Sequence, residues 1–463
     1  MGQPIDIKSA EKVPRKDVYA LDRKAVAAIL YAVEVSDQAQ LLTLINPLHP
    51  ADIADLLEQI NAFERRRLID LYGDAFDGDI LSELDESIRE EVIVSLRPDI
   101  LANAVRDLES DEVVDLLEDL ADRQKAVILE ALLEPDRIAV EHALSYPAYS
   151  AGRLMQREVV MAPEHWTVGD AVDFLRAAKR LPEQFYHVTL VDPKLRPLAN
   201  VTLGKLMSSG RNIALVDIVE EVFRIIPAMQ DEADVAYAFN QYHLISAPVV
   251  DESNRLIGMI TIDDAMAVLE EESQENILRL AGVTESNLSD RVIETAKQRL
   301  PWLAVNLVSA ILASAVIAQF EATIAQLVAL AVLMPIVASM GGNAGTQSLT
   351  VAVRALATRD LTASNMWRVV RREVVVGLIN GLIFALVIGV VGVLWFGSPA
   401  LGGVIAVAMV VNLIVAGLAG TLVPIVLDRF GVDPALASGA FVTTVTDVVG
   451  FFAFLSLAAW VLL

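Results

Sequence analysis

Residues 374–427 contain no Lys, Arg, Asp or Glu, and this uncharged run of 54 residues constrains the fold more than any other feature. A membrane-spanning helix needs ~20 apolar residues, so the run is long enough for two spans that turn at the segment FGSPALGG. Three further segments are long and mostly apolar, namely 301–320, 322–353 and 434–463. The pattern predicts a membrane domain of five helical spans over residues 300–463.

The charges are confined almost entirely to the first 300 residues. The chain has 36 Lys and Arg against 61 Asp and Glu, a net charge of −25, yet only six residues of each sign lie after residue 300. An acidic portion of this kind attracts cations and repels nucleic acid, so no nucleic-acid partner is expected. Cysteine is absent, which excludes disulfides and thiolate metal sites.

Arginines between the expected spans predict the orientation of the chain. They occur only between the second and third spans and between the fourth and fifth spans, and basic residues stay on the cytoplasmic side. We therefore expect a multi-pass protein of the cytoplasmic membrane, surrounded by lipid, with its N-terminus cytoplasmic and its C-terminus outside. These arginines are Arg354, Arg359, Arg368, Arg371, Arg372 and Arg429.

Asp447 is the one charged residue in the last 23 positions of the chain. A carboxylate in the middle of a bilayer costs at least ~2.5–3.5 kcal/mol, and the spans hold no Lys or Arg to pair with it. Thr443 and Thr444 lie on the same helix side, four and three positions earlier, respectively. These residues predict a cation site, with a protonated Asp447 hydrogen-bonded between helices as the alternative. Asn306 and Asn412 are interpreted first as interhelical hydrogen bonds.

The second expected span contains the segment MPIVASMGGNAGTQSLT, residues 334–350. Pro335 and three glycines predict a break in the helix, which is tolerated at membrane depth where it faces protein or a water-filled cavity. The freed carbonyls, with the amide of Gln347, would then face hydrated cations. The alternative is close packing of glycines between helices. The residues predicted here for an ion pathway are Gly341, Gly342, Asn343 and Gly345.

Residues 20–145 have apolar residues at steps of three and four, interrupted by polar turns. This pattern predicts short amphipathic helices in a stacked, all-helical N-terminal domain, and the segment YPAYSAGRLM marks its end.

Residues 150–272 contain a duplication with an offset of 59 residues, seen when 191–207 is aligned with 250–266. Each copy predicts a strand, a tight turn, a strand and a helix. The pair resembles tandem CBS domains, and this resemblance implies that Thr261 and Asp264 approach an adenine nucleotide such as ATP. The first copy departs from that pattern with Ala199 and Lys205 at the corresponding places.

An acidic stretch follows the duplication and leads to a connecting helix expected over residues 273–299. Asp263 is interpreted first as a helix N-cap and the run of glutamates as a solvated face. Their place between a sensor-like module and the first span favours a regulatory cation site. The residues predicted to contribute are Asp251, Asp263, Asp264, Glu271 and Glu275.

The order of these parts resembles the MgtE family of magnesium transporters and channels. The motifs that carry the resemblance are RLPWL, PIVASMGGNAGTQS, RALATRDL and GVDPALASGAFVTTVTDVVG. The resemblance implies a homodimer with a Mg²⁺-selective pore on its twofold axis and Asp447 as the selectivity site. It also implies cytoplasmic domains that bind several Mg²⁺ ions and hold the pore closed.

Two other functions stay open on the residues alone. A transporter of Co²⁺ or Mn²⁺ could share the architecture, although carboxylate and carbonyl ligands without cysteine favour hard ions such as Mg²⁺. A membrane-anchored nucleotide sensor is the second, but it needs a single span and gives Asp447 no use. An enzyme is not expected, because the five scattered histidines offer no metal-ligand spacing.

Overall fold

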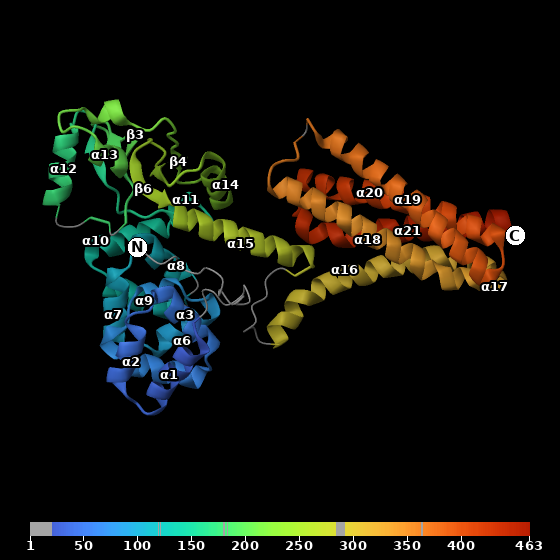
Figure 1. The fold of residues 1–463 in the computed structure, drawn as a ribbon, viewed down its shortest axis with the longest axis horizontal. Coiled ribbons are helices and arrows are strands. Elements are labelled where there is room, and N and C mark those ends of the chain that lie inside the picture. The colour runs from blue at the N-terminus through green and yellow to red at the C-terminus, as the bar shows by residue number, and fades with distance from the viewer. Residues whose placement is uncertain are drawn as a thin grey trace, which may run out of the picture. The chain divides into compact units, whose positions relative to one another are not determined.

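The computed structural model describes residues 21–118, 120, 122–178, 181–182, 184–283, 292–362 and 364–463. The chain divides into two compact units, one up to Glu270 and one from Glu271 to Leu463 (Figure 1). The first unit holds the helical domain and the duplicated α/β module, and the second holds the apolar helices.

The N-terminal domain is all helical, as predicted, and its helices share one apolar core formed by residues between Ile29 and Ala143. Several helices start with a side-chain cap. At α4 the cap is reciprocal: the Asn61 side chain accepts from the Glu64 backbone, and the Glu64 side chain accepts from the Asn61 backbone. The elements are α1 (Arg23–Glu34), α2 (Gln38–Ile45), α3 (Pro50–Gln59), α4 (Ala62–Tyr72), η2 (Gly73–Ala75), α5 (Asp79–Ser82), α6 (Glu86–Ser95), α7 (Pro98–Asp107), α8 (Ser110–Glu118), α9 (Asp122–Ala131) and α10 (Glu134–Ala143).

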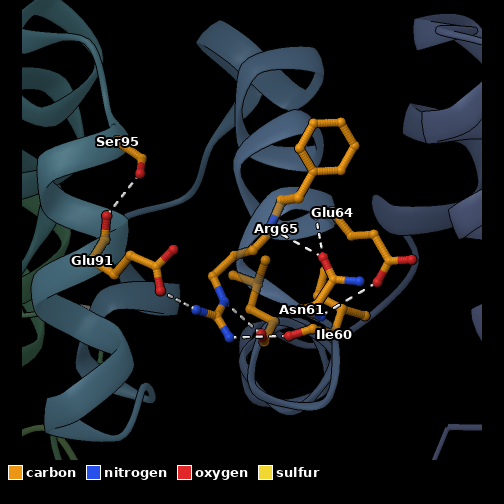
Figure 2. Close-up of polar contacts among 8 residues, drawn as sticks. Ile60, Asn61, Glu64, Arg65, Glu91 and Ser95 are labelled. Atoms are coloured by element: carbon orange, nitrogen blue, oxygen red, sulfur yellow. Dashed lines mark hydrogen bonds and ion pairs between the residues drawn. The ribbon is translucent and has the colours of Figure 1, made fainter.

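A buried arginine joins successive layers of this domain (Figure 2). Arg65 is 5% exposed; its Nε donates to the Leu57 carbonyl at 2.7 Å and its Nη2 donates to the Ile60 carbonyl at 3.1 Å. Its Nη1 forms an ion pair with Glu91. The guanidinium therefore satisfies carbonyls at the end of α3 and links α4 to α6.

The same arrangement recurs 24 positions later. Arg89 donates from Nε to the Leu84 carbonyl at 3.1 Å and from Nη1 to Asp115 Oδ2 at 2.7 Å. Each of the three residues follows its counterpart around Arg65 by the same interval. The repeated contact supports the predicted stacking of similar helical layers.

The α/β module consists of two three-stranded sheets with orders β1-β2-β3 and β4-β5-β6. In each sheet the first pair is parallel and the second antiparallel. The strands β2 and β5, and likewise β3 and β6, are offset by the predicted 59 residues, so the duplication is confirmed. The elements are α11 (Ala151–Leu154), β1 (Met161–Pro163), α12 (Val168–Ala177), β2 (His187–Val191), β3 (Pro197–Thr202), α13 (Leu203–Ser208), η3 (Leu215–Ile218), β4 (Ile226–Pro227), α14 (Glu232–Tyr242), β5 (Ser246–Val250) and β6 (Leu256–Thr261).

Helix α15 (Ile262–Leu280) leaves the second sheet directly. The residue before it is Thr261, whose hydroxyl donates to Asp264 Oδ2 at 2.7 Å, so the interpretation of Asp263 as the N-cap is wrong. The connecting helix expected over 273–299 lies partly outside the described residues. Its first described part belongs to α15, and its last, from Val292, is continuous with the first span.

Five long helices confirm the predicted spans, and Figure 1 shows them packed as one bundle. Gly397, with a φ of 64°, ends the third span at the expected turn. The helices of this unit are α16 (Val292–Ala318), the short α17 (Glu321–Gln326), α18 (Ala329–Ala357), α19 (Met366–Phe396), α20 (Pro399–Arg429) and α21 (Pro434–Leu462).

The predicted break in the second span is wrong, because α18 is helical throughout residues 329–357. Its glycines serve close packing instead. A Cβ on Gly341 would lie 2.3 Å from Asn412 Nδ2, and one on Gly345 would lie 2.7 Å from Val442 Cγ1. The missing side chains allow α20 and α21 to approach α18.

Candidate functional site

Asp447 lies in the middle of α21, inside the candidate span Ser438–Leu462. Its side chain is only partly buried. Within the described ranges, no residue donates a hydrogen bond to its carboxylate or forms an ion pair with it. A carboxylate in such a position requires water or a cation on its open side.

The two threonines predicted beside Asp447 have different surroundings. Thr443 is exposed, and its hydroxyl donates to the Gly439 carbonyl at 2.9 Å. Thr444 donates to the Ala440 carbonyl at 2.6 Å and also contacts the Ser309 hydroxyl of α16. Thr443 therefore shares the open side with Asp447, whereas Thr444 helps join α16 to α21.

Helix α18 presents a polar stripe that the sequence interpretation only partly identified. Asn343 and Gln347, which were considered for the pathway, are exposed on it, and Gly342 borders it. Gly341 and Gly345 are buried on other sides of the helix, against α20 and α21. A helix of this length in lipid needs a hydrated surface or a partner for such a stripe. Its exposed polar members are Ser339, Asn343, Thr346, Gln347 and Thr350.

Asn412 confirms its interpretation as an interhelical hydrogen bond. It is fully buried in α20, and its Nδ2 donates to the Val337 carbonyl of α18 at 2.8 Å. Gly341 and Gly450 leave the space that the amide fills. This contact fixes α18 against α20 and α21 and so holds the polar stripe in place.

A second group of interest is an acidic cluster in the first unit, formed by Glu109, Asp111, Glu112, Glu158, Asp263 and Asp264. Ser110 donates from its hydroxyl to Glu158 Oε2 at 2.9 Å, and its Oγ accepts from the Arg157 backbone at 2.8 Å. These contacts join the start of α8 to the segment before β1. The cluster thus lies where the helical domain meets the α/β module.

Carboxyl pKa values in this cluster are raised. Burial raises the pKa of Glu109 to about 7, and the charges of Glu158 and Glu112 add to the rise. Burial and the charge of Asp264 raise the pKa of Asp111 well above its usual range. The pKa of Asp264 itself rises to about 7, mainly through burial, although the Thr261 hydrogen bond opposes this. Carboxyl groups are therefore crowded here, and burial favours their protonated forms.

Asp111 also has an unsatisfied atom. Its Oδ1 is buried and has no hydrogen-bond partner in the part of the chain that the structure describes. A buried carboxylate oxygen without a donor is costly unless the group is protonated or a cation is bound.

The structure separates the predicted regulatory residues. Asp263 and Asp264 belong to the cluster. Asp251 accepts from the Ser253 and Arg255 backbone, both at 2.8 Å, and so stabilises the turn between β5 and β6. Glu271 and Glu275 lie further along α15, where Glu275 forms an ion pair with Arg279 at 2.5 Å.

The acids contributed by the helical domain were missed by sequence reasoning. The segment ESDE at 109–112 was available as a signal of a helix start rich in carboxylates, but acids at a helix N-terminus are common because they favour the helix dipole. Over the described residues, no three His, Asp or Glu side chains converge as a preformed metal centre.

Known families match three parts of the chain. Residues 334–457 match MgtE, described as a divalent cation transporter, and residues 48–149 match the MgtE intracellular N domain. Residues 217–271, which include the second copy of the duplication, match the CBS domain.

Similar proteins cover nearly the whole chain. The magnesium transporter MgtE of Thermus thermophilus is 33% identical over 454 residues, which is 95% of this chain and 98% of the relative. That of Bacillus subtilis is 29% identical, covering 90% of this chain and 92% of the relative. The cytosolic domain of the Mg²⁺ channel MgtE in complex with ATP is similar with a TM-score of 0.49 and 26% identity, over 52% of this chain and 99% of that domain.

Five spans joined to a helical domain and a CBS pair define a multi-pass membrane transport protein. The chain belongs to the MgtE family of divalent cation transporters.

Proposed function

We propose that this chain transports Mg²⁺ across the cytoplasmic membrane along a path lined by Asp447, Thr443 and the polar stripe of α18. The observation that carries the proposal is the partly buried Asp447 carboxylate within a span, which has no hydrogen-bond or ion-pair partner among the described residues. The names of the relatives, all magnesium transporters, support the choice of ion.

The path is completed by a second copy of the chain. One chain offers a single carboxylate here, and two Asp447 residues facing each other across a twofold axis would supply two. Mg²⁺ releases its bound water reluctantly, so the two carboxylates hold a hydrated ion through its waters. The arginine distribution supports a cytoplasmic N-terminus and an external C-terminus.

Replacement of the carboxylate tests this proposal. Asp447→Asn keeps the size of the side chain and removes its charge, so Mg²⁺ uptake into proteoliposomes should fall at least about tenfold. Asp428→Asn, an exposed carboxylate at the end of α20, is the matched control and should leave uptake unchanged. Wild-type uptake in the Asp447 variant, with folding intact, would refute the assignment.

The identity of the ion is tested with the same vesicles. Oxygen ligands alone favour Mg²⁺, whereas a nitrogen or sulfur ligand would favour Co²⁺. Uptake of Mg²⁺ should therefore exceed that of Co²⁺ and Mn²⁺ at equal concentration. Faster uptake of either competitor would favour the alternative ion, and no uptake of any ion would favour a membrane-anchored sensor.

The acidic cluster is the proposed site of control. Its donors are all oxygen, its charges repel one another, and the orphaned Asp111 Oδ1 lies among them, so the chemistry of the residues suits Mg²⁺. The described carboxylates do not converge as a metal centre, so binding requires them to move closer together. A bound divalent ion would neutralise Asp111, Glu109 and Asp264 together and draw the helical domain towards the α/β module. Asp251, Glu271 and Glu275 stay predicted contributors outside this cluster.

In this proposal, the arrangement in which Mg²⁺ draws the helical domain towards the α/β module is the one that closes the ion path. A shift from 1:99 to 99:1 requires ~5.5 kcal/mol of differential binding, which several weak sites supply together. Asp111→Asn should raise the Mg²⁺ concentration that halves the flux, whereas Asp55→Asn, exposed on α3, should not. Equal responses in the two variants would remove the cluster from the mechanism.

ATP binding at Thr261 and Asp264 stays a prediction. Both side chains are engaged with each other at the start of α15, and Asp264 lies among carboxylates that repel phosphate unless a cation is bound. Calorimetric titration with ATP, with and without Mg²⁺, tests it, and Mg²⁺ should be required.

A further inference from the structure

The last turn of α15 contains an arginine shared by two carboxylates. Arg279 Nη2 lies 2.5 Å from Glu275 Oε2, one turn earlier on the same helix, and Nη1 lies 3.2 Å from Asp433 Oδ2. The three side chains are 31%, 30% and 33% exposed, so the contact is partly shielded from water. Arginine suits such a site because its fork serves two acceptors and it keeps its charge at any cellular pH.

The two carboxylate oxygens of Asp433 make different contacts. Oδ1 accepts from the backbone of Ala435 at 2.7 Å and of Leu436 at 3.4 Å, which caps α21. Oδ2 faces Arg279. The residue that begins the helix of Asp447 is therefore the residue that holds the end of α15.

An apolar contact reinforces this junction. Leu280, next to Arg279, packs against a small buried cluster from α18, the helix of the polar stripe, and from α21. The cluster residues are Leu349, Val353, Ala435 and Val442.

We propose that Arg279 is a coupling residue that ties α15 to the first turn of α21, so that movement of α15 is transmitted to the helix of Asp447. The inference rests on the proposed function. Asp447 follows Asp433 by 14 positions on one continuous helix, a rise of roughly 21 Å, so a displacement of the cap moves the carboxylate as part of a rigid element. Because the bridging group is a side-chain cation, the junction holds when no divalent ion is bound.

Two single variants and their combination test the coupling. Arg279→Gln removes the cation, and Asp433→Asn removes the charge while keeping an equally good N-cap. In proteoliposomes, each should raise the Mg²⁺ concentration that halves the flux by about fivefold. The double variant should show no larger shift than either single variant, because both remove the same contact. Flux at low Mg²⁺ and the melting temperature should stay at wild-type values.

Arg299→Gln is the matched control, because Arg299 is exposed and forms no ion pair with the described residues. Mg²⁺ should halve the flux of this variant at the wild-type concentration. If Mg²⁺ halves the flux of Arg279→Gln and Asp433→Asn at the same concentration as in the wild type, the coupling is overturned and the proposed function stays intact. Additive shifts in the double variant would also overturn it, since they indicate independent roles. A wild-type protein whose flux ignores Mg²⁺ would overturn both proposals at once.

Discussion

The imidazole of His187 and the hydroxyl of Ser246 are hydrogen-bonded at 2.6 Å across 59 positions of sequence. That separation equals the offset of the duplication, so equivalent positions of β2 and β5 meet each other. Both residues are buried, and His187 Nε2 lies 3.0 Å from Glu220 Oε2. The two copies therefore share a polar contact at their common interface.

This contact predicts a loss of stability in acid. Burial lowers the pKa of His187 below its ordinary value of 6.5, although Glu220 opposes the effect. The unfolded chain then binds the proton more readily, so the stabilisation is complete above pH 6.5 and declines as the pH falls through the lowered value. The wild type should melt at a higher temperature than His187→Gln at about pH 7.5, and this difference should become smaller as the pH is lowered to about 5. His165→Gln, at an exposed histidine, is the matched control.

A second prediction concerns the buried arginine of the helical domain. Arg65→Ala leaves two carbonyls and the Glu91 carboxylate without their donor, so unfolding should become easier by about 3 kcal/mol. Arg66→Ala removes an exposed neighbour on the same helix and should change the unfolding free energy by less than about 0.5 kcal/mol. Chemical denaturation measures both. Equal effects of the two substitutions would contradict the structural role of Arg65.

Sequence patterns predicted the parts of the fold that are marked by a long uncharged run or by a regular repeat. Uncharged runs defined the five spans, and the offset of 59 residues defined the paired sheets, because both depend on local composition. The interior of α18 was mispredicted because glycine has two uses: it allows a break, and it allows close approach. Only the positions of Asn412 and Val442 decide between them.

The candidate site likewise contains residues that the sequence could predict and residues that it could not. Asp447 was predictable because a carboxylate among apolar residues is anomalous wherever the helix lies. The partners of Asp264 were not, since Glu109 and Asp111 come from another domain and their convergence depends on tertiary packing. Asp433 gave no signal beyond that of an ordinary helix cap.

The acidic cluster predicts a pH dependence of the opposite sign. The folded-state pKa of Glu109 is about 7 against an ordinary 4.5, so the folded chain holds the proton more tightly. Stability should fall as the pH rises from the ordinary value to about 7, and each kcal/mol lost lowers the melting temperature by about 2–4 °C. Mg²⁺ should flatten this slope by replacing the protons. A slope that is the same with Mg²⁺ and with chelator would contradict cation binding at the cluster.

Adjacent glycines of α18 offer the sharpest test of how the bundle is packed. Gly341→Ala places a methyl group 2.3 Å from Asn412 Nδ2, which must move and loses its hydrogen bond to the Val337 carbonyl. The expected cost is about 1–3 kcal/mol. Gly342→Ala meets no atom within 4 Å and improves helix propensity, so the protein should be as stable as the wild type or slightly more so. Thermal unfolding in detergent separates the two. If both substitutions were neutral, α18 and α20 would not pack through Gly341, and the polar stripe would lose the contact that orients it.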